Sequence, residues 1–241
     1  MNKKQFSETL FEAFNSNGLG DKLDEKKAEK LFQFAQILVE TNKSFNLTAI
    51  TEENDIILKH FADCATALDH LPNGASIIDV GCGAGFPSIP IAILREDVNV
   101  TALDSTAKRI GFINDVIKEL SLNNICGVAG RAEDFAKTKR EYFDVSISRA
   151  VARLNILSEL CLPLTKIGGK FIAMKSSNGE EELSESKKGI GLLGGRLSEK
   201  QIIELSLSTM KIEREIYVFE KASKTPIQYP RNYSQISKKP L

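Results

Sequence analysis

The sequence contains no tryptophan, only two histidines and four cysteines in 241 residues, and no two cysteines form a C-x-x-C pair. Common zinc and iron–sulfur sites need clustered cysteine or histidine ligands, so this scarcity argues against a metal centre. The cysteines are typical of free thiols in a reducing compartment. No apolar run approaches the roughly 20 residues of a membrane span, and the N-terminus, MNKKQFSETL, lacks the apolar segment of a signal peptide. We therefore expect a cytoplasmic protein without a metal or a membrane segment.

The formal net charge of zero hides an uneven distribution. Residues 1–72 carry 8 lysines against 12 acidic residues, whereas residues 221–241 carry 5 basic residues and no acidic one. A basic segment of this kind favours contact with nucleic acid. It is equally typical of a solvated tail, and its three prolines fit a tail that packs back on the sheet.

The residues from Ser76 to Pro90, SIIDVGCGAGFPSIP, have the most informative pattern. The stretch begins as a short buried strand, continues through Gly81, Gly83 and Gly85, and ends in a helical pattern. Such a turn lets backbone N–H groups approach a ligand and points a helix N-terminus at it. The pattern predicts a nucleotide-type pocket, and a tight turn without a ligand is the alternative.

The spacing of the glycines indicates which nucleotide is bound. A dinucleotide fingerprint, G-x-G-x-x-G, fails because residue 86 is Phe, and no P-loop string occurs. The string D-x-G-x-G-x-G from Asp79 to Gly85 instead resembles the S-adenosylmethionine-dependent methyltransferases. In that class an acid at the end of the next strand holds the ribose hydroxyls, and the next expected strand here, 99–104, ends in Asp104.

Hydrophobic periodicity predicts an α/β protein with an N-terminal helical extension. Three helices, 3–14, 24–41 and 55–71, precede the first strand. We then expect five strands at 76–80, 99–104, 125–130, 143–149 and 169–175. Helices begin between them near Phe86, Thr106, Ala132 and Leu154. A helix at 180–193 and an antiparallel pair at 200–207 and 213–221 close the chain.

Alternating strands and helices form a parallel sheet whose carboxyl ends bind ligands. The fold class expected is therefore a Rossmann-like S-adenosylmethionine-dependent methyltransferase fold with a seven-stranded, mostly parallel sheet. The expected division is a helical extension at 1–72, a cofactor-binding domain at 73–222 and a basic tail at 223–241.

Motifs at the strand ends narrow the resemblance to one family. They are Asn46-Leu47-Thr48-Ala49-Ile50, His60 with Asp63, Gly81 to Pro87, Gly130-Arg131-Ala132-Glu133, Ser148-Arg149-Ala150-Val151, Met174-Lys175, Tyr229-Pro230-Arg231 and Pro240-Leu241. Together they resemble the RsmG family, also called glucose-inhibited division protein B, over the whole chain. Two positions depart from the family pattern, since Ser176 follows Lys175 and Cys64 follows Asp63. The first leaves the substrate side of the pocket less defined.

The resemblance implies methylation of N7 of a guanine in small-subunit ribosomal RNA, with S-adenosylmethionine as cofactor and S-adenosylhomocysteine as product. The implied partner is that RNA or an assembling small subunit, and no obligate protein partner is evident. The implied cofactor-binding residues are Gly81, Gly83, Gly85, Phe86, Asp104, Ser105, Thr106, Ala132, Glu133 and Arg149. The implied RNA-binding residues are Asn46, Lys175, Arg231, Lys238 and Lys239.

Each implied role has a simpler structural alternative. Phe86 suits the core of a helix, and Glu133 suits the first turn of a helix, where an acid interacts favourably with the dipole. Arg149 follows a buried strand, so its guanidinium must reach the pocket or a carboxylate. His60 and Asp63, one helical turn apart, are typical of a local polar pair. Arg149 and Lys175 are candidates for a catalytic role, although no acid or base is assigned.

Missing motifs restrict the chemistry further. Exocyclic-amine methylation generally uses an N/D-P-P-Y/F string where this chain has Ser148-Arg149-Ala150-Val151. Pyrimidine-carbon methylation needs a cysteine nucleophile, and neither Cys126 nor Cys161 ends a strand at the pocket. Guanine N7 carries an in-plane lone pair and needs no general base. A small-molecule methyltransferase and a non-catalytic ribosome-associated nucleotide-binding factor remain alternatives.

Overall fold

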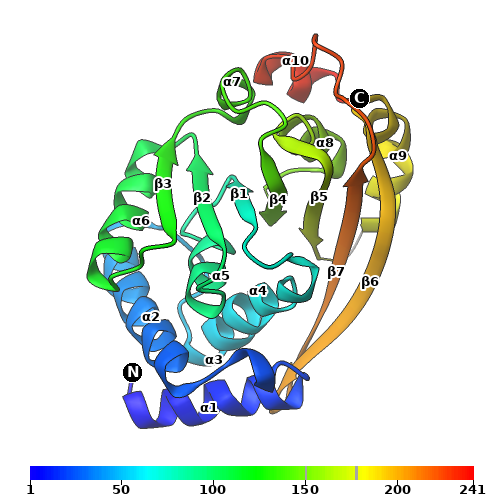
Figure 1. Ribbon diagram of the computed structural model, residues 1–241. Helices are drawn as coiled ribbons and strands as arrows, with labels where there is room; N and C mark the ends of the chain where they lie inside the picture. The colour runs from blue at the N-terminus through cyan, green and yellow to red at the C-terminus, as the bar shows by residue number, and fades with distance from the viewer. Residues whose placement is uncertain (150, 177–178) are drawn as a thin grey trace.

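The computed structural model describes residues 1–149, 151–176 and 179–241. A seven-stranded sheet in the order β3-β2-β1-β4-β5-β7-β6 forms its centre (Figure 1). The strands are β1 (Ser76–Val80), β2 (Asn99–Asp104), β3 (Ile125–Ala129), β4 (Phe143–Arg149), β5 (Thr165–Lys175), β6 (Gly195–Leu207) and β7 (Met210–Lys221). The expected fold class is confirmed, because the first five strands run parallel and β7 pairs antiparallel with β5 and β6.

Alternate residues of the strands face two different hydrophobic cores. Ile77, Ile172 and Val218 belong to one core, and their neighbours Ile78 and Phe171 belong to the other. Both faces are covered by helices, so the central strands β1 and β4 are buried along most of their length.

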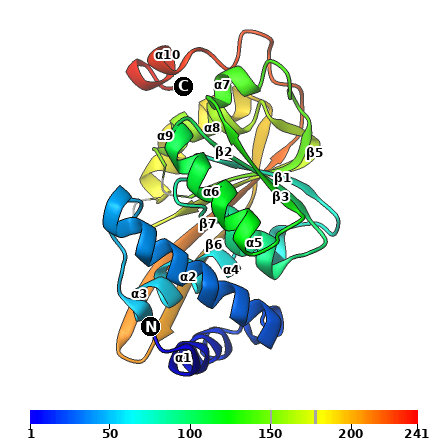
Figure 2. The ribbon, with the colours of Figure 1, turned by 90° about the vertical axis from the view of Figure 1, so that its left-hand side faces the viewer.

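The helices divide between these two faces (Figures 1 and 2). On the first face lie α1 (Lys3–Ser16), α2 (Glu25–Phe45), α4 (Asp63–Ala65), α5 (Ser88–Leu94) and α6 (Ala107–Glu119). On the second lie α7 (Ala132–Phe135), α8 (Leu154–Cys161), α9 (Gly179–Leu192) and α10 (Tyr233–Lys238). No helix within the described ranges is long and apolar enough to cross a membrane.

The N-terminal helices share a core with the sheet. Phe61 contacts Phe6 edge-on and Phe34 at a tilt, with ring centroids 6.4 and 5.9 Å apart, and all three rings are fully buried. They belong to the same hydrophobic core as Ile77 of β1. The division at residue 72 stays a prediction.

The third predicted helix differs from expectation in its geometry. It consists of α3 (Glu53–Ile56), a π-helical segment Ile57–Ala62, α4 and a 3₁₀ turn Leu68–His70. Single π turns inside α-helices are frequent at functional sites, and this one carries His60. The wider turn was not predictable from hydrophobic spacing, which does not separate α from π geometry over six residues.

The closing hairpin is longer than predicted. β6 begins at Gly195 and β7 at Met210, because backbone pairing continues from Gly195↔Lys221 to Leu207↔Met210 although most side chains of β6 are exposed. The far end of the hairpin reaches the C-terminus of α1. There the side-chain amide of Asn17 donates to the carbonyl of Ser206 and accepts its N–H, at 2.8 Å each. Periodicity alone cannot find strand residues that lack a buried face.

The segment after β7 is ordered and folds back over the sheet. Ile236 of α10 is fully buried, and a Cβ on Gly189 would meet Leu241, so the last residue packs on α9. Lys221, which the sequence counted among the basic tail residues, is fully buried, and its Nζ donates to the carbonyls of Leu162 and Leu193. The structure thus favours the packed-back alternative for this segment.

Candidate cofactor and substrate site

A cavity of about 430 Å³ opens at the carboxyl ends of β1 to β4. Eight of the ten predicted cofactor-binding residues line it: Gly81, Gly83, Phe86, Asp104, Ser105, Ala132, Glu133 and Arg149. Gly85 and Thr106 do not line the cavity. They shape the loops that carry its lining residues. Gly85 has φ +91° and begins the turn into α5. The N–H of Thr106 donates to Asp104 Oδ1 at 2.8 Å.

The glycine loop is fastened to β2 so that its backbone faces the cavity. The N–H groups of Gly81 and Cys82 both donate to the carbonyl of Leu103, at 2.8 and 3.1 Å. Gly81 has φ +77°, and a Cβ there would lie 2.7 Å from Val151 Cγ2. Only glycine fits this combination of positive φ and close approach.

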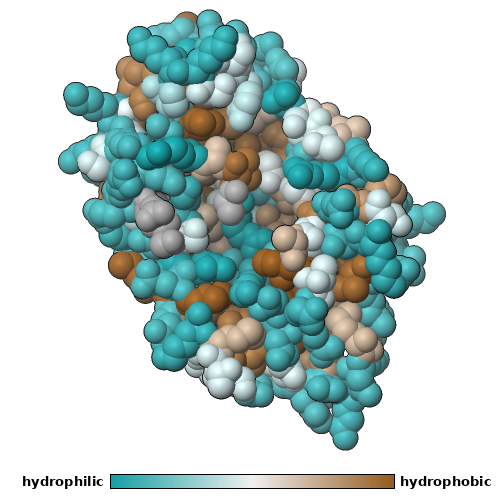
Figure 3. Space-filling view, turned by 180° about the vertical axis from the view of Figure 1, so that it is seen from behind, coloured by the Kyte–Doolittle hydropathy of each residue, from teal (hydrophilic) through white to brown (hydrophobic). Residues whose placement is uncertain are grey.

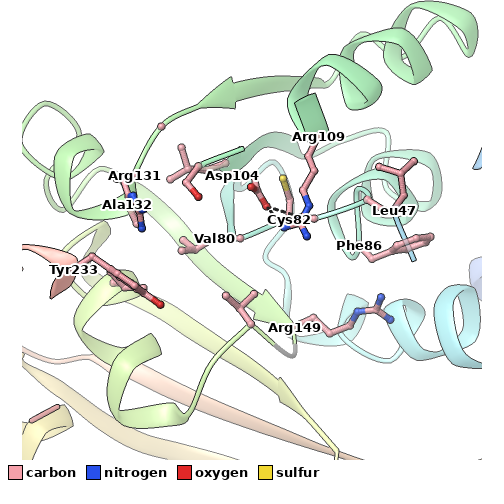
Figure 4. Close-up of a pocket in the computed structure, with 18 of the residues that line it drawn as sticks. Leu47, Val80, Cys82, Phe86, Asp104, Arg109, Arg131, Ala132, Arg149 and Tyr233 are labelled. Atoms are coloured by element: carbon pink, nitrogen blue, oxygen red, sulfur yellow. Dashed lines mark hydrogen bonds and ion pairs between the residues drawn. The ribbon is translucent and has the colours of Figure 1, made fainter. Parts of the chain in front are cut away.

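Asp104 lies at the centre of the cavity wall (Figure 4). Its Oδ2 accepts the N–H of Gly83 at 3.0 Å, and Arg109 Nη1 lies 3.4 Å away. A carboxylate offers about four acceptor positions, so Asp104 can hold the loop and still accept bonds from a ligand diol. The site therefore fits a nucleoside cofactor: the carboxylate of Asp104 suits the ribose diol, and the glycine loop beside it lets a ligand approach the backbone closely.

The far end of the cavity is built from α7 and α10. Ala132 and Glu133 begin α7, and Glu133 Oε1 accepts the N–H of Tyr233 at 3.2 Å. Tyr233 and Arg131 also line the cavity. The sequence analysis named neither among the cofactor-binding residues, although Arg131 lies within the motif Gly130-Arg131-Ala132-Glu133.

Arg149 lies in a network of buried polar groups at the other end of the cavity. Its Nη1 donates to Asp63 Oδ2 and to the carbonyl of Lys59, and its Nη2 lies 3.0 Å from His60 Nδ1. Arg149 thus meets both sequence expectations, because it lines the cavity and pairs with a carboxylate. Ala150, which follows it in the quoted motif, lies outside the described residues.

His60 is neutral in this network. Burial, followed by the charge of Arg149, lowers the pKa of His60 to about 3. A guanidinium has no acceptor, so Nδ1 accepts from Arg149 and Nε2 carries the proton, 3.3 Å from Thr48 Oγ1. The ring stacks on Phe86 with centroids 4.0 Å apart. Phe86 itself is buried against Phe34, so it serves the core as well as the cavity wall.

Cys82 is a cavity thiol that was not among the nucleophiles considered from the sequence. It lines the cavity within the glycine loop, and burial raises its pKa above the usual range. The thiolate is the nucleophilic form, so this burial works against covalent catalysis. No group of three or more metal-ligating side chains occurs among the residues that the structure describes.

A second cavity, of about 330 Å³, lies on the other side of Arg149 and His60, which line both. Its remaining lining residues are Ile50, Lys59, Asp63, Met174, Lys175, Ser176 and Arg214. Arg214 Nε lies 3.2 Å from Asp63 Oδ1. Lys175, a predicted RNA-binding residue, pairs with Glu182 at 2.7 Å and donates to the carbonyl of Ala152. The sequence missed Lys59 and Arg214, since neither belongs to a quoted motif.

The remaining predicted RNA-binding residues lie apart from both cavities. The RNA contact of Arg231 stays a prediction. In this structure Glu159, a fully buried carboxylate, accepts from Arg231 Nε and Nη2 at 2.9 and 2.5 Å. Its guanidinium is therefore engaged in the fold. Lys238 and Lys239 are exposed, and Asn46 is an exposed residue with φ +47° at the C-terminus of α2.

Comparison with known proteins identifies the family. The family model GidB, rRNA small subunit methyltransferase G, matches residues 27–210. This chain belongs to the GidB family. Relatives named ribosomal RNA small subunit methyltransferase G include those of Clostridium tetani and Clostridium perfringens. They are 46% and 44% identical over 241 residues, with 98% of this chain and 99% of the relative covered. The family expected from the motifs is confirmed.

Solved structures that resemble this GidB-family chain share its fold at low identity. Precorrin-6y C5,15-methyltransferase from Geobacter metallireducens matches with TM-score 0.52 and 15% identity, covering 75% of this chain and 92% of the other. TYW2 of M. jannaschii, solved in complex with AdoMet, matches with TM-score 0.50 and 16% identity, covering 65% and 74%. Both likenesses support the methyltransferase fold and nothing finer.

Proposed function

We propose that this protein transfers the methyl group of S-adenosylmethionine to N7 of a guanine in small-subunit ribosomal RNA. One observation carries the proposal. Of the described cavity-lining side chains, the imidazole of His60 is neutral and engaged at both nitrogens, and the thiol of Cys82 has a raised pKa. The cavity carboxylates of Asp104 and Glu133 already accept backbone N–H groups. A site whose imidazole and carboxylates are engaged in the fold, and whose thiol stays protonated, suits an acceptor that already carries its own lone pair.

The glycine loop and Asp104 are expected to contact different parts of the cofactor. In this proposal Asp104 accepts from the ribose hydroxyls, the Gly81 to Gly83 backbone lies against the chain that joins ribose to methionine, and Ala132 with Glu133 contacts the adenine. When bound, S-adenosylmethionine supplies an electrophilic methyl group on a sulfonium sulfur. Arg109 lies at the edge of the same wall and is half-exposed, so it is free to move as the diol binds.

The acceptor base enters, in this proposal, from the second cavity. Lys59, Lys175 and Arg214 line it, and cationic side chains attract the phosphates that flank a target nucleotide. The Arg149 and His60 pair separates the two cavities and is fixed by Asp63 and Thr48. Its part in catalysis is positioning, and alignment of nitrogen, methyl carbon and sulfur can supply about 7 to 11 kcal/mol.

The chemistry proposed needs no metal, and the proposed site of action is the cytoplasm. The resemblance leaves two substrates possible, naked RNA and an assembling subunit. A small-molecule methyltransferase would instead act on free acceptors, and a non-catalytic factor would bind the cofactor without turnover. The location of cationic groups beside the cofactor cavity favours the RNA substrate.

A tritiated-methyl assay tests the proposal. Ribosomal RNA and small subunits from cells lacking the protein are incubated with enzyme and labelled S-adenosylmethionine, and the labelled base is mapped. We expect label at a single guanine, as 7-methylguanine, and none on small acceptors. Asp104→Asn is the comparison variant. Its one side-chain oxygen can accept from the N–H of Gly83 or of Thr106 but not from both, so we expect weaker cofactor binding and less label. Label on another base, or none on RNA, would contradict the proposal.

A further inference from the structure

The C-terminal segment is fastened at several points above the carboxyl ends of the strands. The guanidinium of Arg140 donates to the carbonyls of Thr225, Pro226 and Tyr229, at 2.7, 3.0 and 2.7 Å. Glu159 of α8 accepts the backbone N–H of Arg231 at 2.8 Å in addition to its side chain. These bonds fix the backbone immediately before α10.

Fixing the backbone there places the first residue of α10 at the cofactor cavity. The N–H of Tyr233 donates to Glu133 Oε1, and Ile236 one turn later is fully buried. Both ribbon views place α10 beside α7, which carries Glu133 (Figures 1 and 2). The close-up shows the Tyr233 ring reaching from this segment toward Val80, below Arg131 and Ala132 (Figure 4).

The surroundings of the ring suit a flat heterocycle. Tyr233 shares its end of the cavity with Val80 and Ala132, whose side chains are aliphatic. The guanidinium of Arg131 lies over the ring, 5.0 Å from its centroid, and this interaction holds the ring in place. The residue is 38% exposed and lines the cavity, so part of its surface remains available to a ligand.

We propose that Tyr233 forms one wall of the adenine subsite, so that the C-terminal segment takes part in binding the cofactor. An aromatic ring stacks on a base through its π-face, and the fixed backbone spares most of the ordering cost of that contact. The proposal rests on the proposed function, because it takes the ligand of the first cavity to be S-adenosylmethionine. It also extends the cofactor site to a residue that lies outside the cofactor-binding residues expected from the sequence.

The absence of tryptophan from the sequence provides a direct probe. A Tyr233→Trp variant carries a single tryptophan at the subsite, and we expect its fluorescence to change when S-adenosylhomocysteine or adenosine is added. The control is Tyr142→Trp, which places the tryptophan at the start of β4, outside both cavities. We expect no change in its emission.

Calorimetric titration with S-adenosylhomocysteine measures the contribution of the ring. We expect Tyr233→Ala to raise its Kd about 5- to 100-fold, the range for one aromatic contact with a base. Tyr233→Phe keeps the stacking face and should stay within about twofold of the wild type. The affinity for adenosine should fall in Tyr233→Ala by the same factor as the affinity for S-adenosylhomocysteine, because both ligands carry the adenine base.

Three outcomes would overturn the inference. An unchanged Kd in Tyr233→Ala, together with unresponsive emission from the Tyr233→Trp variant, removes the ring from the subsite. A raised KM for RNA at an unchanged cofactor Kd assigns the ring to RNA. Failure of the wild-type protein to bind S-adenosylhomocysteine at all contradicts the proposed function itself. If the wild-type protein binds it and the residue-233 variants bind it equally well, only this inference is contradicted.

Discussion

His60 shows how neighbours fix the protonation state of a residue. Arg149 donates toward one ring nitrogen, Thr48 lies beside the other, and Phe86 covers one face. Burial and the adjacent guanidinium both disfavour the imidazolium, so the pKa of His60 falls to about 3. A residue held neutral in this way accepts a bond from Arg149 and orients it, but it does not titrate near neutral pH.

The first prediction follows from that state. We expect the rate of methyl transfer to show no limb near the ordinary histidine pKa of about 6.5, and His60→Asn to retain turnover within about tenfold. The side-chain oxygen of asparagine takes the place of Nδ1 and can still accept from Arg149, although the shorter amide does not reach Thr48. Initial rates between pH 5.5 and 8 measure this. A steep loss below pH 6.5 that disappears in the variant would reveal a general base.

Asp79 is a buried acid whose state should depend on pH. Its side chain is fully buried, Oδ2 accepts the N–H of Ser88 at 3.1 Å, and Oδ1 has no partner within the described ranges. Burial raises the pKa of Asp79 to about 7. Between pH 4 and 7 the folded state therefore holds a proton that the unfolded state releases, and stability is lost as the pH rises through this window.

The second prediction is that Asp79→Asn stabilises the protein increasingly above pH 5. The amide does not titrate and still offers Ser88 an acceptor. One pKa unit corresponds to about 1.4 kcal/mol, so we expect the difference in free energy of unfolding to reach about 2 to 4 kcal/mol at pH 8 and to vanish near pH 4. Urea unfolding at both pH values measures it. An equal difference at both would mean that Asp79 is ionised throughout.

At the scale of the elements, most of the fold was predictable because its strands are buried. β1, β2 and β4 have the predicted bounds, since short segments rich in Val, Ile and Leu or alternating apolar and polar residues, flanked by turn residues, leave few alternatives. The bounds of β6 and β7 were too short, because backbone pairing there extends over exposed residues. The π turn at Ile57–Ala62 was not predicted, because its geometry depends on packing around His60 and Asp63.

The third prediction concerns the attachment of α10. Arg231→Ala leaves the carboxylate of Glu159 buried without its guanidinium, and losing one partner of a buried pair costs about 3 to 5 kcal/mol. Thermal and urea unfolding measure this loss. Lys238, the last residue of α10, is exposed. We therefore expect Lys238→Ala to change the free energy of unfolding by no more than about 0.5 kcal/mol. If Glu159→Gln does not restore part of the stability of Arg231→Ala, the buried charge is not the cause.

At the scale of the whole molecule, the site draws on segments that are far apart in the sequence. Residues at the ends of parallel strands, such as Asp104 and Arg149, were predictable because those ends meet at one edge of the sheet. Arg214 and Tyr233 were not. Their positions depend on how the closing hairpin and the last segment pack, and no periodicity in the sequence records that.

The basic residues discussed above differ in how far they are available to RNA. Figure 3 shows a face that is hollowed near its centre, with hydrophilic side chains covering most of the surface around the hollow. Lys59, Lys175 and Arg214 line one cavity, whereas the engagement of Lys221 and Arg231 in the fold leaves Lys238 and Lys239 as the exposed cations of α10 and its end. RNA binding should therefore depend on salt through few groups.

The last prediction concerns those two lysines, and it separates RNA binding from cofactor binding. Neither lines the cofactor cavity, and each phosphate contact on single-stranded RNA contributes about 0.7 to the slope of log affinity against log salt. We expect the double variant Lys238→Ala with Lys239→Ala to flatten that slope by about 1 to 1.4, at an unchanged Kd for S-adenosylhomocysteine. The matched control replaces Lys3 and Lys4 of α1, at the opposite end of the molecule in Figure 1. Filter binding of ribosomal RNA at several salt concentrations measures both variants, and an equal slope in the two would show that α10 lies outside the RNA interface.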